Sequence, residues 1–210
     1  MTRSEQILEE ILTGCGISFK KIPESQISGE KRPDYLVGTE DRPTYWEVKE
    51  LDENPEERKI INSATGQLSE VYSVDSERVA DKLDAAFKQF ESYKVTDHPC
   101  VIVLYDARSF FTFDFLFEQE ISSHLIGNGH YTNNECGESR EIHRTKSTLY
   151  RRGKHYISGL AVIRRNNELV FYHNPHTTNP LTDCDLLTPI KTQYVASKKE
   201  NGTTWISSQF

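Results

Sequence analysis

A short stretch near the N-terminus, residues 33–49, constrains the fold more than any other part of the sequence. It contains two runs that favour β-strands, Tyr35–Gly38 and Thr44–Leu51. The residues between them, Thr39–Pro43, are polar and carry turn chemistry. The stretch therefore predicts a β-hairpin, and it is unusual because charged residues stand where an internal strand should carry apolar ones.

The predicted hairpin gathers acidic and basic side chains at one place. Glu47 and Lys49 are two residues apart, so they point to the same face of the sheet. A symmetric turn sets Asp34 opposite Val48 and diagonally between Glu47 and Lys49. Two carboxylates so close together repel each other unless a cation lies between them, and hard oxygen ligands suit Mg²⁺ or Mn²⁺.

An ion in this position would polarise a phosphoryl oxygen and lower the pKa of a bound water, which Lys49 could hold. These are the parts needed to hydrolyse a phosphodiester. The alternative is an exposed hairpin whose solvated face carries an ordinary ion pair. Trp46 and Val48 flank the charges and indicate an internal strand, which favours the metal site.

Pro33-Asp34, followed after twelve residues by Glu47-Val48-Lys49, resembles the signature of the PD-(D/E)xK nuclease superfamily, which has a restriction-endonuclease-like fold. The resemblance implies that Asp34 and Glu47 bind Mg²⁺ or Mn²⁺, with the Val48 carbonyl as a further candidate ligand. It also implies that Lys49 is the catalytic lysine. The expected substrate is nucleic acid, and DNA in the first place because DNA is the prevalent substrate of the family.

Two alternatives stay open for the function. The first is a catalytically inactive member of the same fold that binds nucleic acid or protein, although the intact Asp34, Glu47 and Lys49 argue against a decayed site. The second is an unrelated metal-dependent phosphoesterase that acts on small nucleotides.

Residues 75–94 have the strongest helical pattern in the chain. The apolar face consists of Val79, Leu83, Ala86, Phe87 and Phe90. Lys82 and Gln89 lie two turns apart on one flank of that face. In several PD-(D/E)xK families a lysine and a glutamine in this position approach the scissile phosphate, so the resemblance adds both to the catalytic residues. The alternative is an amphipathic helix with polar residues at its boundary.

The order of the predicted elements gives the fold class. A helix is expected at Ser4–Thr13, a strand at Ile17–Ile22, and a strand buried on both faces at Cys100–Tyr105. With the hairpin and the long helix this makes an α/β protein with the αβββαβ order of a restriction-endonuclease-like core and a mixed central sheet. The 210 residues are interpreted as one nuclease-like domain with a core at about 4–106 and an elaboration at about 107–210.

The first helix adds one further candidate. Ser4 is its expected N-cap, and Glu5 lies near the edge of its apolar stripe. A glutamate on the first helix can contact the metal or its water in the superfamily. The alternative is an exposed carboxylate that only caps the helix.

The region after residue 126 contains a loop and then a basic stretch. Gly127–Gly137 is expected to be a loop because of its composition. Arg140–His155 follows with Glu141 as its one acidic residue, and its basic residues are Arg140, Arg144, Lys146, Arg151, Arg152 and Lys154. This stretch is the candidate for phosphate contacts, or it is a solvated face that balances the acidic run at 52–57.

Two further hydrophobic runs, Ile157–Ile163 and Leu169–Tyr172, predict a second hairpin that could extend the core sheet. From Leu187 onward the chain is polar with scattered apolar residues, which is typical of a peripheral strand or a docked tail.

Composition limits the partners. The net charge of −7 excludes a protein that coats nucleic acid generally, so any contact must use a local basic surface. The four dispersed cysteines indicate neither a zinc ribbon nor a disulfide framework. No signal peptide or membrane-spanning run is recognised, so a cytoplasmic location without membrane partners is expected. A homodimer is compatible with the superfamily.

Overall fold

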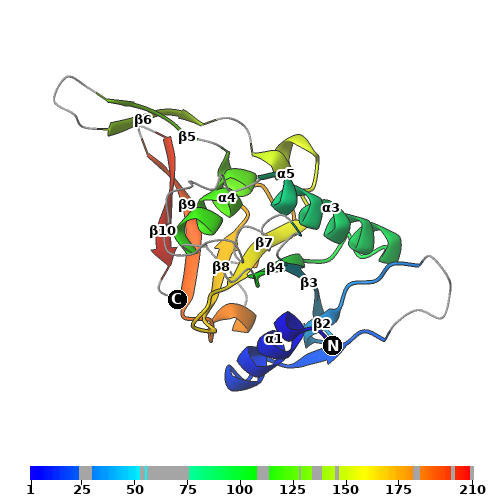
Figure 1. Cartoon of the computed structure of the whole chain (residues 1–210). Helices are drawn as coiled ribbons and strands as arrows, with labels where there is room; N and C mark the ends of the chain where they lie inside the picture. The colour runs from blue at the N-terminus through cyan, green and yellow to red at the C-terminus, as the bar shows by residue number, and fades with distance from the viewer. Residues whose placement is uncertain are drawn as a thin grey trace.

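The computed structural model describes residues 1–23, 30–52, 55, 76–107, 114–127, 129–133, 139–144, 147–181, 185–199 and 202–208. For residues 76–77, 114–119, 129–133, 139–144, 198–199, 202–205 and 208 it describes the backbone only. The helices are α1 (Arg3–Gly14), α3 (Ser76–Tyr93), α4 (Asp114–Ile126), α5 (Thr148–Arg151) and the 3₁₀-helix η1 (Asp185–Leu187). Figure 1 shows the helices around a central sheet.

The central sheet is mixed and has eight strands in the order β1-β2-β3-β4-β7-β8-β9-β10. These are β1 (Phe19–Lys21), β2 (Tyr35–Thr39), β3 (Arg42–Leu51), β4 (Cys100–Asp106), β7 (Ile157–Ile163), β8 (Leu169–His173), β9 (Thr192–Lys199) and β10 (Gly202–Ser208). Strands β3, β4 and β7 are parallel neighbours, and β8 and β9 are also parallel. The other neighbouring pairs are antiparallel.

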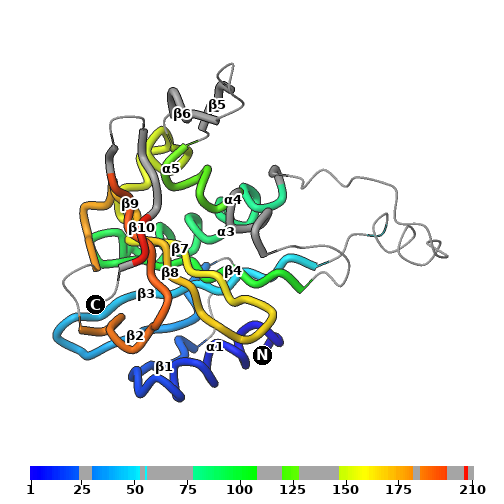
Figure 2. The backbone as a smooth tube through the Cα atoms, turned by 90° about the vertical axis from the view of Figure 1, so that its left-hand side faces the viewer, coloured from blue at the N-terminus to red at the C-terminus, as the bar shows by residue number. Residues whose placement is uncertain are grey.

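Alternating side chains divide the interior into two cores. On one face, α1 covers apolar residues such as Tyr35, Trp46 and Val103. On the other face, α3 and α4 cover residues such as Leu51 and Ile102. Figures 1 and 2 agree on this division, with α1 on one side of the sheet and α3, α4 and α5 on the other. Strand β4 contributes to both cores, as its continuous apolar run predicts.

Most of the predicted elements are confirmed. The first six described elements follow the expected order α-β-β-β-α-β. The predicted apolar stripe of α3, Val79 to Phe90, is buried. The second predicted hairpin forms β7 and β8 and extends the sheet, and the polar C-terminal region adds β9 and β10 at its edge.

Outside the β2–β3 hairpin, two local predictions were wrong. Gly127–Gly137 was expected to be a loop, but Gly129–Asn133 forms β5 and pairs with β6 (Ser139–Arg144). The prediction failed because the Gly and Asn residues on either side favour a loop, whereas the His-Tyr-Thr segment between them favours a strand. The N-cap of α1 is Thr2 rather than Ser4, because the Thr2 side chain accepts from the Glu5 amide while Glu5 accepts from the Thr2 amide.

No helix in the described part of the chain is long and apolar enough to span a bilayer.

Candidate active site

Strands β2 and β3 place the acidic residues closer together than the sequence predicted. Thr39 pairs with Arg42 and Tyr35 pairs with Trp46, so Asp34 is level with Glu47 and not with Val48. The prediction failed because the turn contains only residues 40 and 41. Side chains directly opposite each other on antiparallel strands have Cβ atoms about 5 Å apart. The two carboxylates are therefore direct neighbours across the hairpin.

The backbone of β3 also contributes a hydrogen bond to the acidic pair. The amide of Tyr45 donates to Pro99 and the carbonyl of Leu51 accepts from Ala107, so odd-numbered residues of β3 bond to β4. Even-numbered residues therefore turn their backbone groups toward β2, and the Val48 amide donates to Asp34 Oδ2 at 2.8 Å. The ladder position opposite Val48 belongs to Pro33, which has no N–H to offer the Val48 carbonyl.

A chain of hydrogen bonds fixes the lysine. Lys49 Nζ donates to Glu47 Oε1 and to Gln89 Oε1, both at 2.5 Å. Gln89 Nε2 donates to the carbonyl of Arg32 at 2.9 Å. Lysine only donates and a carbonyl only accepts, so the Gln89 amide has one orientation that satisfies both partners. Helix α3 thereby holds the ammonium of Lys49 beside Glu47.

Glu47 is almost completely buried, with 1% of its surface exposed. Burial raises its pKa to about 8, the nearby Asp34 carboxylate adds to this shift, and the Lys49 ammonium only partly opposes it. Its second oxygen, Oε2, is buried and receives no hydrogen bond in the ionised carboxylate, and Asp34 is the group to which a protonated Glu47 donates. Burial also raises the pKa of Asp34, although the hydrogen bond from the Val48 amide opposes that shift. The site thus holds two acidic groups with an uncompensated buried oxygen.

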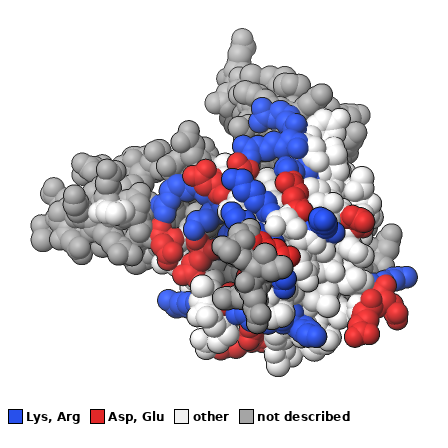
Figure 3. All heavy atoms as spheres, turned by 90° about the vertical axis from the view of Figure 1, so that its right-hand side faces the viewer, with Lys and Arg blue, Asp and Glu red and all other residues white. Residues whose placement is uncertain are grey.

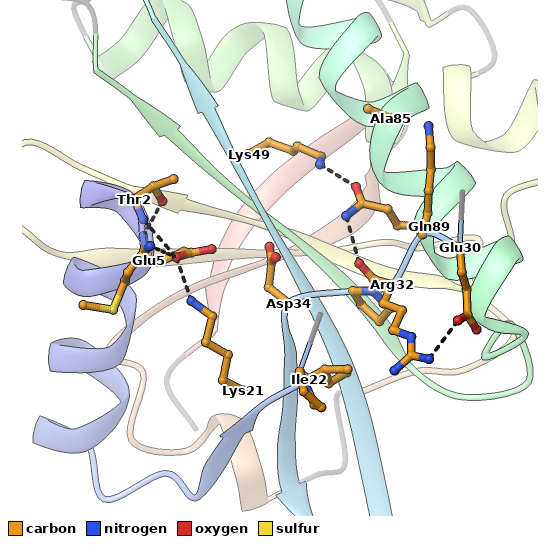
Figure 4. A pocket seen from close by; sticks show the side chains of 14 residues that line it. Thr2, Glu5, Lys21, Ile22, Glu30, Arg32, Asp34, Lys49, Ala85 and Gln89 are labelled. Atoms are coloured by element: carbon orange, nitrogen blue, oxygen red, sulfur yellow. Dashed lines mark hydrogen bonds and ion pairs between the residues drawn. The ribbon is translucent and has the colours of Figure 1, made fainter. Parts of the chain in front are cut away.

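Asp34, Lys49 and Gln89 line a pocket of about 690 Å³, whereas the buried Glu47 and Val48 are not among the described residues that line it. Figure 4 shows Asp34 at its centre, with Lys49 and Gln89 on one side and Glu5 with Lys21 on the other. Lys21 donates to Glu5 at 2.8 Å. Burial raises the pKa of Glu5, but the hydrogen bonds from Lys21 and Thr2 outweigh it, so the net shift is downward.

The donor set fits a hard divalent cation. Asp34, Glu47 and the Val48 carbonyl offer oxygen atoms alone, and the orphaned Glu47 Oε2 needs a partner. The described residues contain no group of three or more His, Cys, Asp or Glu side chains arranged around one ion. Mg²⁺ is commonly bound by one or two carboxylates together with waters and substrate phosphates, so two carboxylates suffice.

Lys82 was predicted to lie at the site with Gln89. It lies on α3, is half-buried, and is not among the described residues that line the pocket, whereas Ala85 and Gln89 are. The structure therefore brings Asp34, Glu47, Lys49 and Gln89 together and leaves Lys82 at the side.

Two residues of the predicted basic stretch, Arg152 and Lys154, lie across α3 from the pocket. Arg152 pairs with Asp84 and Lys154 pairs with Glu91, two residues of α3 on the flank away from Gln89. Arg151 is exposed at the end of α5. Arg140 and Arg144 lie on β6, where only the backbone is described, and Lys146 and most of the acidic run at 52–57 lie outside the described residues. Figure 3 views the molecule from the right-hand side of Figure 1 and shows basic side chains gathered in its upper part, with acidic ones between them.

Sequence reasoning missed Arg32 and Lys21, which also line the pocket. Arg32 directly precedes Pro33-Asp34, and this adjacency was the available signal. Lys21 carried none, because its place beside the pocket depends on the pairing of β1 with β2.

No protein-family model matches the sequence, and no curated protein or solved structure matches the chain. The resemblance to PD-(D/E)xK nucleases therefore rests on the residues of this chain and their arrangement.

Proposed function

We propose that this protein is a metal-dependent nuclease of PD-(D/E)xK type, with a restriction-endonuclease-like core, that hydrolyses phosphodiester bonds of nucleic acid, DNA in the first place. One observation carries the proposal: Asp34 and Glu47 lie opposite each other, and the buried Glu47 has an unpartnered oxygen. Such a carboxylate is stabilised by a cation, and a metal ion would serve that purpose.

In this proposal Asp34, Glu47 and the Val48 carbonyl hold Mg²⁺ or Mn²⁺. When bound, the ion polarises a phosphoryl oxygen and makes a bound water more acidic. Lys49 positions the attacking water and stabilises negative charge that develops on the phosphoryl group. Gln89 keeps the ammonium in place through its bond to the Arg32 carbonyl. Asp34 is itself held by the Val48 amide, so the acidic pair is positioned before substrate arrives.

The experiment compares cleavage of plasmid, linear duplex and single-stranded DNA and of RNA by wild type, Asp34→Ala and Lys49→Ala with Mg²⁺, with Mn²⁺ and with EDTA. We expect metal-dependent cleavage by wild type, and a loss of at least about a hundredfold in both variants. Glu40→Gln, which changes an exposed residue of the β2–β3 turn, is the control. Equal activity in all proteins, or activity in none, contradicts the proposal.

The inactive binding protein remains the second candidate. The ion pairs Arg152–Asp84 and Lys154–Glu91 favour this alternative, because they hold two of the predicted phosphate-contacting residues away from the pocket. Nucleic-acid binding by wild type without cleavage under any metal condition would select this alternative.

A further inference from the structure

Arg32 has an incompletely satisfied guanidinium at the edge of the pocket. Its Nη2 lies 2.8 Å from Glu30 Oε2, and its guanidinium lies over the Tyr93 ring, 5.5 Å from the centroid. Its Nε is buried and has no hydrogen-bond partner. Leaving a buried N–H of a charged group unpaired is unfavourable, so an acceptor is expected there in some state of the protein.

The backbone of this segment is fixed while the side chain has a choice of partners. The Arg32 carbonyl accepts from Gln89, and the Lys31 amide donates to Ser92 Oγ at 3.2 Å, so α3 holds both residues. Figure 4 shows the guanidinium turned toward Glu30 and away from Asp34. The Arg32 side chain is 26% exposed and lines the pocket, with its Nε on the buried side.

Two other cations of the pocket lining, Lys21 and Lys49, are engaged more completely, whereas Lys31 is exposed. Lys21 is paired with Glu5, and Glu5 is also fixed by the cap of α1. Lys49 donates to Glu47 and Gln89. Arg32 is the cation in this lining whose buried donor is unfilled. Its planar fork matches a phosphate with two parallel hydrogen bonds, which an ammonium cannot do.

We propose that Arg32 is the phosphate clamp of this pocket, and that Glu30 occupies its guanidinium until a backbone phosphate of the nucleic acid replaces the carboxylate. This inference rests on the proposed function, because it names the contact that holds the substrate strand at the same site. The Tyr93 ring supports the guanidinium from one side and keeps its plane oriented. The Glu30 carboxylate competes with phosphate for the Arg32 guanidinium. A ligand without a phosphate in this position therefore does not displace Glu30.

The test measures binding of a fluorescein-labelled DNA strand and of its duplex to the full-length protein in EDTA, where cleavage cannot consume the probe. Arg32→Met and Arg32→Lys remove the fork, and Glu30→Gln removes the competitor. Arg42→Met, at the exposed first residue of β3, and Glu40→Gln, in the β2–β3 turn, make the same charge changes away from this pocket.

We expect Arg32→Met to weaken binding at least about tenfold relative to Arg42→Met. Arg32→Lys should fall between wild type and Arg32→Met, because it keeps the charge without the fork. Glu30→Gln should tighten binding a few-fold relative to Glu40→Gln. Because Glu30→Gln removes no packed side chain, it tests the proposal even if Arg32→Met proves unstable in thermal melts.

Binding by Arg32→Met that equals binding by Arg42→Met overturns the clamp, as does Glu30→Gln binding no more tightly than Glu40→Gln. Absence of binding by wild type to both probes overturns it too. The two proposals can fail separately. If wild type cleaves and Arg32→Met binds as well as its control, the nuclease proposal stands and the clamp is wrong. If binding depends on Arg32 but no metal supports cleavage, the clamp stands and the nuclease proposal is wrong.

Discussion

Glu47 combines near-complete burial with an acidic side chain, and its neighbours do not fully compensate it. At neutral pH, with no cation bound, its raised pKa keeps a proton on the carboxyl group. A divalent cation must displace that proton, so metal affinity should rise with pH up to about 8. Metal binding and proton release are therefore coupled at this residue.

The same coupling predicts how stability depends on pH in EDTA. Below the ordinary value of 4.5, Glu47 is protonated in the folded and unfolded chains alike. As pH rises from 4.5 to about 8, only the unfolded chain ionises, so the free energy of unfolding falls. In Glu47→Gln the free energy of unfolding should not show this fall between pH 4.5 and 8, which is on the order of a few kcal/mol.

Chemical denaturation of both proteins at a series of pH values checks this, with the exposed Glu40→Gln as control. Added Mg²⁺ should restore stability to wild type at pH 8 and not to Glu47→Gln. Parallel curves for wild type and Glu47→Gln would mean that Glu47 ionises normally in the folded protein.

Gln89 and Lys82 offer a matched pair on one helix. Gln89→Met removes the acceptor that holds Lys49 and leaves the Arg32 carbonyl without its donor, so we expect kcat to fall by about tenfold or more. Lys82→Met removes a charge two turns away, outside the pocket lining, and should change kcat by less than about twofold. Steady-state cleavage rates measure both. A larger loss for Lys82→Met would restore the role that the sequence predicted for it.

At the scale of elements, a buried threonine locks the hairpin that carries the site. Thr44 Oγ1 donates to the Val37 carbonyl and accepts from Trp46 Nε1, both at 2.8 Å. Thr44→Val keeps the shape of the side chain but leaves the buried indole N–H of Trp46 without an acceptor. The free energy of unfolding should therefore fall by about 1–3 kcal/mol. Thr39→Val, at the exposed end of β2, is the control and should change stability little. Urea denaturation of the two variants provides the measurement.

The sequence predicted elements where periodicity or a continuous apolar run was strong, as in α3 and β4. It mispredicted the hairpin register because Glu40-Asp41 lacks the Asn-Gly or Asp-Gly signal of a two-residue turn. Pro43 looked like part of that turn, yet it lies in β3 opposite Gly38. A proline is tolerated there because the β3–β4 ladder begins only at Tyr45, so no partner needs the missing N–H.

The candidate site was predictable to the extent that it is local in sequence. Asp34, Glu47 and Lys49 belong to one hairpin, so strand periodicity brought them together. Beyond its adjacency to Pro33-Asp34, Arg32 gave no local signal, because its contacts with Gln89 and Tyr93 of α3 join residues more than fifty positions apart. The basic stretch was visible as composition, but its pairing with Asp84 and Glu91 was not.

At the scale of the whole molecule, the site depends on residues beyond the predicted core boundary near residue 106. Strand β3 is supported by β4, and β4 is supported by β7 from the C-terminal half. Residues 100–104 of β4 are completely buried, and α4 and α5 belong to the core that covers α3. The C-terminal half is therefore part of the same sheet and supports the strand that carries Glu47 and Lys49.

This arrangement predicts that a chain ending at Asp106 does not fold. Strand β4 would become an edge, and its buried residues and those of α3 would lose their cover, at about 1.5–3 kcal/mol for each large apolar side chain exposed. A chain ending at Lys199 loses β10, the edge strand of the described sheet, which pairs there with β9, and should keep the fold. Near-UV circular dichroism and thermal melting distinguish the two. Cooperative melting of the shorter chain would show that the N-terminal core folds by itself. In that case α4, α5 and β7 are not needed for the stability of the strands that form the pocket.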